Sequence, residues 1–331
     1  MKTRGLGARG PQVGEIALGC MSFASFYGPP TTEEACRAVL RRAMEAGVTH
    51  LDTARAYGDG LSEEIIGRFI KDHPDNGFVI ATKGGILKSP DGGRHFENAP
   101  VALRDYLEGS LARLGVDHVP MYYVHRRDQN HPIEAVMETL LRFKDEGKIG
   151  GIGFSEISPS SLRRAAAVGP VDAVQSEYSL WTRLPELGMI QACAEVGAAF
   201  VAFSPLGRGI FGDTDLDRAS FGSVDFRSKT PRFEPDNFAK NMEHVRALRA
   251  IAAEVGVPTA ALAIAWVLDQ APHIVPIPGT CQAAHLDEVL EAQNVEMTDA
   301  LRGEIAKAMP VGFAHGDRYS AAQQVGIERY C

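Results

Sequence analysis

Four polar side chains follow three successive apolar segments of the chain. The segment 48–53 contains Asp52 near its end and is followed by Tyr57. Lys83 follows the segment 78–82, and His125 follows the segment 119–124. If these segments are neighbouring parallel strands, the four side chains meet at one end of the sheet. An acid, a phenol, an ammonium group and an imidazole at one point are suited to proton transfer.

The ammonium group of Lys83 would let Tyr57 donate a proton. A free tyrosine has a pKa of about 10, which is high for a proton donor at neutral pH. A positive charge about 4 Å away stabilises the phenolate by roughly 4 kcal/mol at an effective dielectric of 20, or about three pKa units. Asp52 would keep Lys83 charged, and His125 would orient a carbonyl oxygen. We therefore expect Tyr57 to be a general acid with a pKa near neutrality.

Each of these residues has a plain structural explanation when taken alone. Asp52 could cap a turn, Tyr57 could be a rim aromatic, and Lys83 could be solvated. His125 could be a hydrogen-bonded core histidine. Because all four residues lie at the ends of three consecutive strands, a shared catalytic role is a better explanation than four separate structural roles.

The elements that position these residues follow a regular alternation. Short apolar segments, rich in Val, Ile, Leu and Phe as in a buried parallel sheet, alternate with amphipathic stretches. This pattern predicts a (β/α)8 TIM barrel that forms a single domain over residues 1–331, and the alternative is a doubly wound sheet. The predicted strands are Ile16–Met21, Val48–Thr53, Phe78–Thr82, Val119–Val124, Ile149–Phe154, Val171–Gln175, Ala199–Phe203 and Ile274–Ile277. The predicted helices are Thr32–Ala46, Ser62–Lys71, Ala99–Leu114, Pro132–Glu146, Ser158–Ala167, Gly188–Glu195 and Ala283–Ala292, with two more within Phe238–Asp269.

Two segments add to the barrel pattern. The first, Lys2–Val13, predicts an N-terminal β-hairpin. The second, Pro205–Asp236, follows the seventh strand and shows no helical pattern, so we expect a long loop, a type that often covers a ligand. It contains four phenylalanines, at positions 211, 221, 226 and 233.

Several familiar cofactor and metal motifs are absent from the sequence. Residues 5–10 read GLGARG, but no strand precedes them and no helical pattern follows, so a hairpin turn is the better explanation. There is no Walker A sequence and no HExxH, and His125 and His131 lack partners at metal-ligand spacings. We expect no Rossmann domain and no metal site.

The composition limits the partners and the cellular compartment that we expect for this protein. The 34 Lys and Arg against 42 Asp and Glu give a net charge of -8, which argues against a nucleic-acid partner. The longest uninterrupted apolar segment, Ala260–Leu268, is too short to cross a membrane, and no signal sequence is recognisable in MKTRGLGARG. Five cysteines without a CxxC motif predict free thiols in a reducing cytoplasm.

Seven short motifs spread over most of the chain resemble those of the aldo-keto reductase family. They are LDTARAYG (51–58), ATKGG (81–85), YYVHRRD (122–128), GIGFSEIS (151–158), VQSEYSL (174–180), FSPLGRG (203–209) and VPIPGT (275–280). Each is weak alone, but their order and spacing together are specific. The resemblance implies a (β/α)8 barrel that binds an extended nicotinamide cofactor across its C-terminal face.

The resemblance also implies a role for individual residues. Asp52, Tyr57, Lys83 and His125 match the family's catalytic tetrad. Ser155 and Gln175 match the residues that hold the nicotinamide carboxamide, and Tyr178 matches the aromatic ring that stacks on the nicotinamide. The pyrophosphate segment is matched by Ser204, Leu206, Gly207 and Arg208, and the adenosine end by Gly279, Thr280 and Glu288.

Four positions depart from the family pattern. Glu156 stands where many members have Asn, next to the carboxamide site, and Val289 stands where Asn often follows the glutamate. Members that prefer NADPH usually place Lys or Arg after PGT to pair with the 2′-phosphate, whereas this chain has Cys281 and Gln282. We expect NADP(H) as the cofactor, with NAD(H) as an alternative.

Aromatic residues near the expected cavity indicate the substrate class. Phe23, Phe26 and Tyr27 lie in the loop 20–30, and Trp181 follows the sixth strand. Such side chains favour flat or apolar carbonyl compounds, although rim aromatics often only pack on the barrel. Arg318 and Tyr319 of the C-terminal segment are further candidate contacts.

The leading hypothesis is NAD(P)H-dependent reduction of an aldehyde or ketone, or the reverse oxidation of an alcohol. A non-catalytic nicotinamide-binding regulatory subunit is one alternative, because a fold does not fix a function. A Schiff-base lyase that uses Lys83 is another, but pairing with Asp52 would keep that amine charged and unreactive. The sequence does not name the substrate or the oligomeric state.

Overall fold

The computed structural model describes residues 1–28, 30–88, 93–222 and 225–330. Of the segments considered above, Pro29 in the first loop, Ser223 and Val224 in the long loop, and Cys331 lie outside the described residues.

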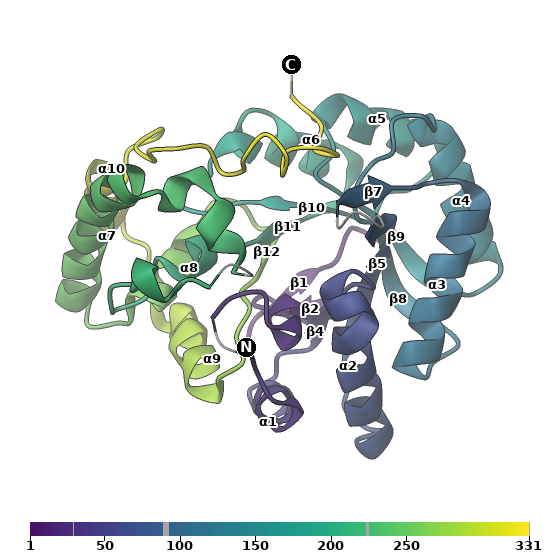
Figure 1. Ribbon diagram of the computed structural model, residues 1–331, viewed down its shortest axis with the longest axis horizontal. Helices are drawn as coiled ribbons and strands as arrows, with labels where there is room; N and C mark the ends of the chain where they lie inside the picture. The colour runs from purple at the N-terminus through teal and green to yellow at the C-terminus, as the bar shows by residue number, and fades with distance from the viewer. Residues whose placement is uncertain (29, 89–92, 223–224, 331) are drawn as a thin grey trace.

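Eight parallel strands form a barrel in the order β12-β11-β10-β9-β8-β5-β4-β3 (Figure 1). This confirms the predicted TIM barrel. The barrel strands are β3 (Leu18–Gly19), β4 (His50–Asp52), β5 (Val79–Gly84), β8 (Val119–Val124), β9 (Ile149–Ser155), β10 (Ala173–Glu177), β11 (Ala199–Phe203) and β12 (Ile274–Ile277). All eight predicted strand segments therefore form the sheet, although the first is only two residues long.

Helices pack around the barrel, and their ends follow local sequence signals. The helices are α1 (Glu33–Glu45), α2 (Leu61–Asp72), α3 (Pro100–Leu114), α4 (Ile133–Asp145), α5 (Pro159–Val168), α6 (Met189–Val196), α7 (Pro235–Val255), α8 (Thr259–Asp269), α9 (Ala283–Leu290) and α10 (Asp299–Ala308). Thr32 caps α1 by accepting a hydrogen bond from the backbone of Ala35, and Ser158 caps α5 in the same way.

The first and last strands close the barrel through two glycines. Gly19 of β3 pairs with Gly279 after β12, and the Gly19 N–H donates to the Pro278 carbonyl at 2.9 Å. A Cβ atom on Gly19 would lie 2.7 Å from the Ile277 oxygen, and one on Gly279 would lie 2.9 Å from the Gly19 oxygen. Larger residues would therefore push the two strands apart.

The N-terminal hairpin covers one end of the barrel. It consists of β1 (Thr3–Gly5) and β2 (Gln12–Gly14), with GLGARG in its turn region, as predicted. Leu6 and Val13 pack with Ala81, Met121 and Tyr123 and with other strand residues in a core of their own. The hairpin therefore seals the end of the barrel opposite the carboxyl ends of the strands.

Three parts of the fold were not predicted from the sequence. A second hairpin, β6 (Ile86–Lys88) and β7 (Arg94–Phe96), follows β5. Helix α10 comes late in the chain and is capped by Thr298. The segment after β11 contains short 3-10 helices, at Gly207–Gly209, Arg218–Ser220, Phe226–Lys229 and Pro231–Phe233, rather than a plain loop.

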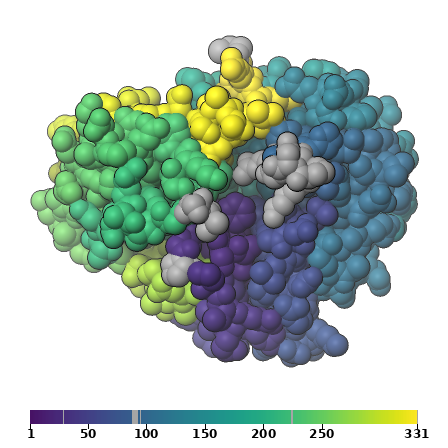
Figure 2. Space-filling model, in the orientation of Figure 1, coloured from purple at the N-terminus to yellow at the C-terminus, as the bar shows by residue number. Residues whose placement is uncertain are grey.

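The C-terminal segment crosses the open end of the barrel. In Figure 1 it runs in yellow from α10 towards α5 and α6. In Figure 2 it lies between the green part of the chain, which carries α7 and α8, and the blue and teal part.

Among the described residues, no single helix has the length and apolar character needed to cross a membrane. Helices α7 and α8 meet those criteria only when taken together, and they are bent by 92° with respect to each other.

Arg4 fastens the N-terminal hairpin to the barrel wall. Its guanidinium group donates to the carbonyl oxygens of Ala271 and Ile274 at 2.7 Å and to that of Leu268 at 2.9 Å.

We expect Arg4→Ala to lower the free energy of unfolding by about 2 kcal/mol, because three acceptors lose a charged donor. Urea unfolding measures this. The exposed Arg9 in the hairpin turn provides the control, because Arg9→Ala should change stability by less than about 0.5 kcal/mol. Equal effects of the two substitutions would contradict the assignment.

Candidate active site

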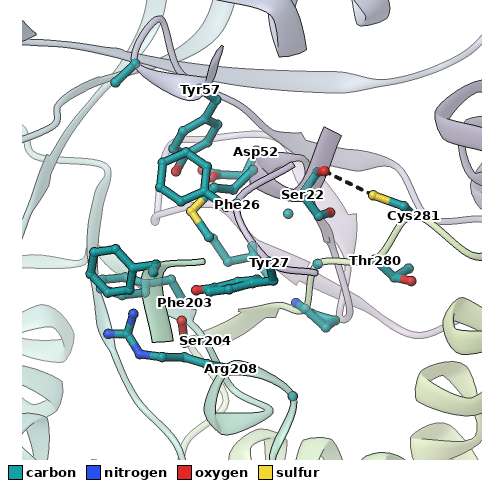
Figure 3. Close-up of a pocket in the computed structure, with 18 of the residues that line it drawn as sticks. Ser22, Phe26, Tyr27, Asp52, Tyr57, Phe203, Ser204, Arg208, Thr280 and Cys281 are labelled. Carbon is teal, nitrogen blue, oxygen red and sulfur yellow. Dashed lines mark hydrogen bonds between the residues drawn. The ribbon is translucent and has the colours of Figure 1, made fainter. Parts of the chain in front are cut away.

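A cavity of about 850 Å³ opens at the carboxyl ends of the strands. The labelled residues in Figure 3 come from the last positions of β4 and β11 and from the loops after β3, β4, β11 and β12, which surround this cavity. Most of the predicted site residues line it: Asp52, Tyr57, His125, Ser155, Gln175, Ser204, Leu206, Arg208, Gly279, Thr280, Gln282, Phe26 and Tyr27.

Lys83 joins the base of the cavity to Tyr57. Its ammonium group donates to the Tyr57 hydroxyl at 3.2 Å and to the Thr53 carbonyl at 2.9 Å, and it forms a salt bridge with Asp52. The Lys83 side chain is fully buried, and that of Asp52 is 2% exposed. The expected contact between the ammonium and the phenol is therefore present, and the pairing of Lys83 with Asp52 is as predicted.

The charge on Lys83 is held by its partner. Burial by itself would lower the pKa of Lys83, but Asp52, with a smaller contribution from Tyr57, raises that pKa above its ordinary value. Lys83 is thus an ammonium ion across the neutral pH range. A charged amine cannot attack a carbonyl carbon, which argues against Schiff-base chemistry here.

The expectation that Tyr57 has a pKa near neutrality is wrong for this structure. Burial raises the pKa of Tyr57 above 10, and the nearby Lys83 charge opposes this shift without overcoming it. The simple Coulomb argument considered only the ammonium ion and left out the cost of removing a phenolate from water. Tyr57 therefore holds its proton at neutral pH.

Two aromatic rings fix the orientation of the Tyr57 side chain. The His125 ring meets it edge-on with centroids 5.7 Å apart, and Phe26 does so at 6.2 Å. The backbone N–H of His125 donates to Gly84 on the neighbouring strand β5, which places the imidazole beside the phenol. Both rings line the cavity, so a molecule bound there would touch the phenol and the imidazole together.

Gln175 and Ser155 are held by charged groups. The Gln175 amide donates to the second Asp52 oxygen at 2.7 Å, and Arg126 donates to the Ser155 hydroxyl at 2.9 Å. Arg126 also lines the cavity, and the sequence analysis did not select it. The signal was present, because Arg126 directly follows His125 at the end of β8.

A buried group of charges lies behind one wall of the cavity. This arginine–glutamate cluster consists of Glu156, Glu177, Arg208, Arg232 and Arg318. Arg208 donates to Glu177 at 2.8 Å, and Arg318 of the C-terminal segment pairs with Glu156 and Glu177. Three cations against two anions leave a net charge of +1 in the cluster.

The cluster charges shift the pKa values of its members. Burial alone would raise the pKa of Glu177, but Arg208 and Arg318 hold it below its ordinary value. Burial lowers the pKa of Arg232 to about 10, so this residue remains charged at neutral pH. Both glutamates and all three arginines are therefore ionised, and Arg208 presents positive charge to the cavity.

Tyr178 does not lie where the resemblance implied. Its side chain is fully buried, its ring packs against Phe200 and Trp266, and its hydroxyl donates to Glu186 at 2.8 Å. Tyr178 follows β10 on the side that faces the helices, so its ring cannot reach the cavity. Phe203, at the end of β11, lines the cavity instead and was missed, although it directly precedes the selected Ser204.

Five further predicted residues do not line the cavity. Phe23 and Trp181 belong to the hydrophobic core, where Trp181 packs edge-on against Phe211 and Phe233. The carboxylate of Glu156 accepts hydrogen bonds from Arg318. Gly207 is absent from the lining although Leu206 and Arg208 on either side contribute to it, and Glu288 on α9 is absent together with both of its neighbours. A residue next to one that lines the cavity therefore need not line the cavity itself.

The long segment after β11 covers the cavity only in part. Phe226 lines the cavity and packs edge-on against Tyr319 at 6.0 Å, whereas Phe211 and Phe233 join the core around Trp181. Tyr319 also lines the cavity, and Arg318 beside it acts from the cluster. The proposed contribution of the C-terminal segment is thus direct for Tyr319 and indirect for Arg318.

His131 has carboxylate neighbours that sequence spacing did not reveal. Its Nε2 atom lies 3.3 Å from Glu97 and 3.6 Å from Asp128, and one ligand atom from each of the three residues falls within 4.8 Å of the others. All three are partly exposed. We assign no metal to this arrangement.

Comparisons with known proteins agree with this geometry. The profile described as "Aldo/keto reductase family" matches residues 15–309. This chain belongs to the aldo/keto reductase family. It is 40% identical over 309 residues to "Aldo-keto reductase yakc [NADP(+)]" of Schizosaccharomyces pombe, a match that covers 92% of this chain and 91% of that protein. It is 37% identical over 314 residues to "Probable aldo-keto reductase 1" of Glycine max, covering 95% and 90%.

A solved structure shows the same architecture. The glycerol dehydrogenase AKR11B4 from Gluconobacter oxydans superposes with a TM-score of 0.82 and is 26% identical, covering 93% of this chain and 96% of that one. The family membership inferred from the seven motifs is therefore confirmed, and this chain is an oxidoreductase of the aldo/keto reductase family.

The salt bridge between Lys83 and Asp52 makes a testable contribution to stability. We expect Lys83→Met to lower the free energy of unfolding by about 3–5 kcal/mol, because Asp52 is left as an unpaired buried charge. The double variant Lys83→Met/Asp52→Asn should recover about 2 kcal/mol of that loss, measured by urea unfolding at pH 7. A double variant no more stable than Lys83→Met would show that the buried charge is not the cause.

Proposed function

We propose that this aldo/keto reductase interconverts an aldehyde or ketone and the corresponding alcohol with NADP(H), and that Tyr57 is the proton donor. The observation that carries the proposal is the 3.2 Å contact between the Lys83 ammonium group and the Tyr57 hydroxyl in the cavity. An ammonium ion at this distance stabilises the phenolate that remains after proton donation. Asp52, Tyr57, Lys83 and His125 form the catalytic group.

The residues of the cavity fit a nicotinamide dinucleotide. Arg208, backed by a cluster of net positive charge, suits the pyrophosphate, together with Ser204 and Leu206. Ser155 and Gln175 are placed beside the catalytic group to hold the carboxamide, and Phe203 offers a ring near them. Gly279, Thr280 and Gln282 line the other end, which suits the adenosine. When bound, the dinucleotide supplies or accepts a hydride.

The chain's own residues then manage the proton. Because the pKa of Tyr57 is raised by burial, the phenol is protonated at neutral pH and can donate from Oη to a carbonyl oxygen. His125, whose ring meets Tyr57 edge-on, orients that oxygen. Lys83 stabilises the phenolate, and Asp52, fixed by Gln175, keeps Lys83 charged and in place. In alcohol oxidation the same groups act in reverse order.

The cavity wall favours carbonyl compounds with an apolar body. The apolar and aromatic residues that line the cavity include Phe26, Tyr27, Leu87 and Phe226. The solved relative named as a glycerol dehydrogenase shows that the fold also serves a small polar alcohol, so a panel of aldehydes and alcohols is the direct assay. The NADP(+) in the name of the yeast relative supports NADP(H), with NAD(H) as the alternative.

The two other hypotheses have less support. A Schiff-base lyase needs a neutral amine, and Asp52 keeps Lys83 charged. A regulatory subunit needs no proton donor, whereas here the donor, its ammonium partner and the imidazole are all assembled. We further propose that residues 1–331 act as one domain in the cytoplasm, with small molecules rather than nucleic acids as partners.

Removal of the Tyr57 hydroxyl tests the proton donor. We expect Tyr57→Phe to lower kcat for aldehyde reduction by about 10³-fold or more, while NADPH binding, followed by quenching of protein fluorescence, changes less than about twofold. The matched control is Tyr122→Phe, which removes a buried hydroxyl that donates to Leu103 at 3.4 Å outside the cavity. Tyr57→Phe with an unchanged kcat would refute the proposed role.

Replacement of Gln282 tests the cofactor preference. Gln282 is exposed and lines the cavity at the proposed adenosine end. We expect Gln282→Arg to tighten NADPH binding roughly tenfold and to leave NADH binding nearly unchanged, because only NADPH has a 2′-phosphate for a charged hydrogen bond. Gln191→Arg adds the same charge on α6, outside the cavity lining, and should change neither. A parallel gain for NADH would count against this placement of the adenosine.

A further inference from the structure

One arginine in the cavity wall has no carboxylate partner. Among the described residues, the arginines that line the cavity are Arg55, Arg126, Arg208 and Arg227. Three of them form salt bridges, Arg208 with Glu177 at 2.8 Å, Arg227 with Asp225 at 2.7 Å and Arg55 with Asp59 at 3.6 Å. Arg126 forms no salt bridge with any residue that the structure describes, although it is the arginine next to His125.

The guanidinium group of Arg126 is buried but only partly hydrogen-bonded. The residue is 8% exposed. Its Nη1 atom donates to the Ser155 hydroxyl at 2.9 Å and to the His125 carbonyl at 2.6 Å. The Nε and Nη2 atoms donate to no described residue, and neither is closed off from solvent. Because Arg126 lines the cavity, these two nitrogens are available to a molecule bound there.

The two available nitrogens are the ones that bind a carboxylate side-on. The Nε–H bond and one Nη2–H bond point in the same direction, so they can donate to both oxygens of one carboxylate. This protein uses the same pair of nitrogens, at 2.7–3.0 Å, in three exposed contacts: Arg68 with Glu33, Arg164 with Glu134, and Arg302 with Asp269. A carboxylate in the cavity would complete the same contact on Arg126.

The carboxylate of Glu156 does not neutralise Arg126. Both Glu156 oxygens accept from Arg318, and one also accepts from the Glu177 N–H. Burial by itself would raise the pKa of Glu156, but Arg318 and, less strongly, Arg126 hold it below its ordinary value. Arg126 therefore adds a fourth cation beside the arginine–glutamate cluster, which has only two anions.

The position of Arg126 relates it to the reacting end of a substrate. Arg126 directly follows His125, whose ring meets Tyr57 edge-on at 5.7 Å. Phe26 also meets Tyr57 edge-on, at 6.2 Å (Figure 3). A small molecule whose carbonyl oxygen contacts Tyr57 therefore has an aromatic ring and an unpaired cation near it in the same cavity.

We propose that the substrate is an aldehyde or ketone with an apolar body and a carboxylate group, and that Arg126 binds this carboxylate through Nε and Nη2. The proposal rests on the proposed function, because it names the class of carbonyl compound. A buried guanidinium without a counter-charge is costly, and an uncharged substrate would displace water from it without replacing the lost hydrogen bonds. A carboxylate supplies both the charge and the two acceptors.

Pairs of acids and esters test the preference for a charge. The probes are 3-carboxybenzaldehyde and 4-carboxybenzaldehyde, each compared with its methyl ester, which has the same aromatic body without the charge. We expect kcat/KM to be at least about tenfold higher for one of the acids than for its ester, because only the acid makes a charged two-point contact. Esters that are reduced as efficiently as both acids would overturn the proposal.

Substitution of Arg126 tests the assignment to this residue. Arg126→Met should abolish the preference for the acid, and Arg126→Lys should keep part of it, because an ammonium group retains the charge without the paired donors. The matched control Arg164→Met removes an arginine of the same side-on geometry on α5, outside the cavity lining, and should keep the wild-type ratio.

A purely structural role of Arg126 gives a different result. If Arg126 only positions Ser155, Arg126→Met should lower kcat/KM equally for the acid and the ester, which would contradict the assignment. If Arg126 instead holds the cofactor, NADPH binding should weaken in Arg126→Met, whereas our proposal expects a change of less than about threefold, since the carboxylate contact belongs to the substrate. Circular dichroism verifies that each variant is folded.

A binding measurement separates this proposal from the proposed function. Calorimetry compares benzoate with benzamide, on the protein alone and with NADP+. We expect benzoate to bind at least about tenfold more tightly than benzamide, and this difference to disappear in Arg126→Met. Benzoate binding that is absent, or that is unchanged in Arg126→Met, would refute the carboxylate site. If benzoate binds as expected but no aldehyde is reduced, the proposed function fails and the carboxylate site stands.

Discussion

The buried salt bridge between Lys83 and Asp52 is the constraint that organises this end of the barrel. A fully buried ammonium ion is tolerated only because a carboxylate, a backbone carbonyl and a phenol surround it. Lys83 lies on β5, whereas its partners come from the end of β4 and from the loop that follows β4. Gln175, from the far side of the barrel, fixes the second oxygen of Asp52. Any change that displaces one of these strands would therefore also displace Tyr57, the proposed proton donor.

A second set of charges plays a similar part along the opposite wall. The arginine–glutamate cluster joins the ends of β9 and β10 to the segment after β11 and to the C-terminal segment. Glu328 extends this connection, because its carboxylate accepts from the Ser158 N–H and pairs with Arg127. The cavity thus has two charged walls, one around the phenol of Tyr57 and one around Arg208. Between them lie mainly apolar and aromatic groups.

The sequence predicted the elements better than the directions of side chains. Strand positions followed from apolar segments, and the proposed catalytic residues followed from the polar residues at the end of each segment. The exceptions have physical causes. Tyr178 was selected by motif and Trp181 as an aromatic residue after the sixth strand, but both side chains are buried in the hydrophobic core. Phe203 and Arg126 were one position from selected residues and were missed because the motif match carried no information on side-chain direction.

Contacts between distant parts of the chain also could not be predicted from the sequence. No local pattern could place Arg318 on Glu156, because these residues are 162 positions apart and meet only through the barrel. The pKa of Tyr57 was misjudged for a related reason. The sequence indicates that the charged Lys83 lies near Tyr57, but it does not show how much water the fold removes from around the phenol.

The contact between Gly19 and Gly279 bears on how the protein is made. A ribosome delivers β3 early and β12 only after most of the chain has been synthesised, so the growing polypeptide passes through a stage with seven strands and a gap in the sheet. During that stage β3 and β11 present unsatisfied edges of the kind that chaperones shield and that neighbouring nascent chains can capture. Only β12 pairs with both of these edges, so the barrel can close only after β12 has been made.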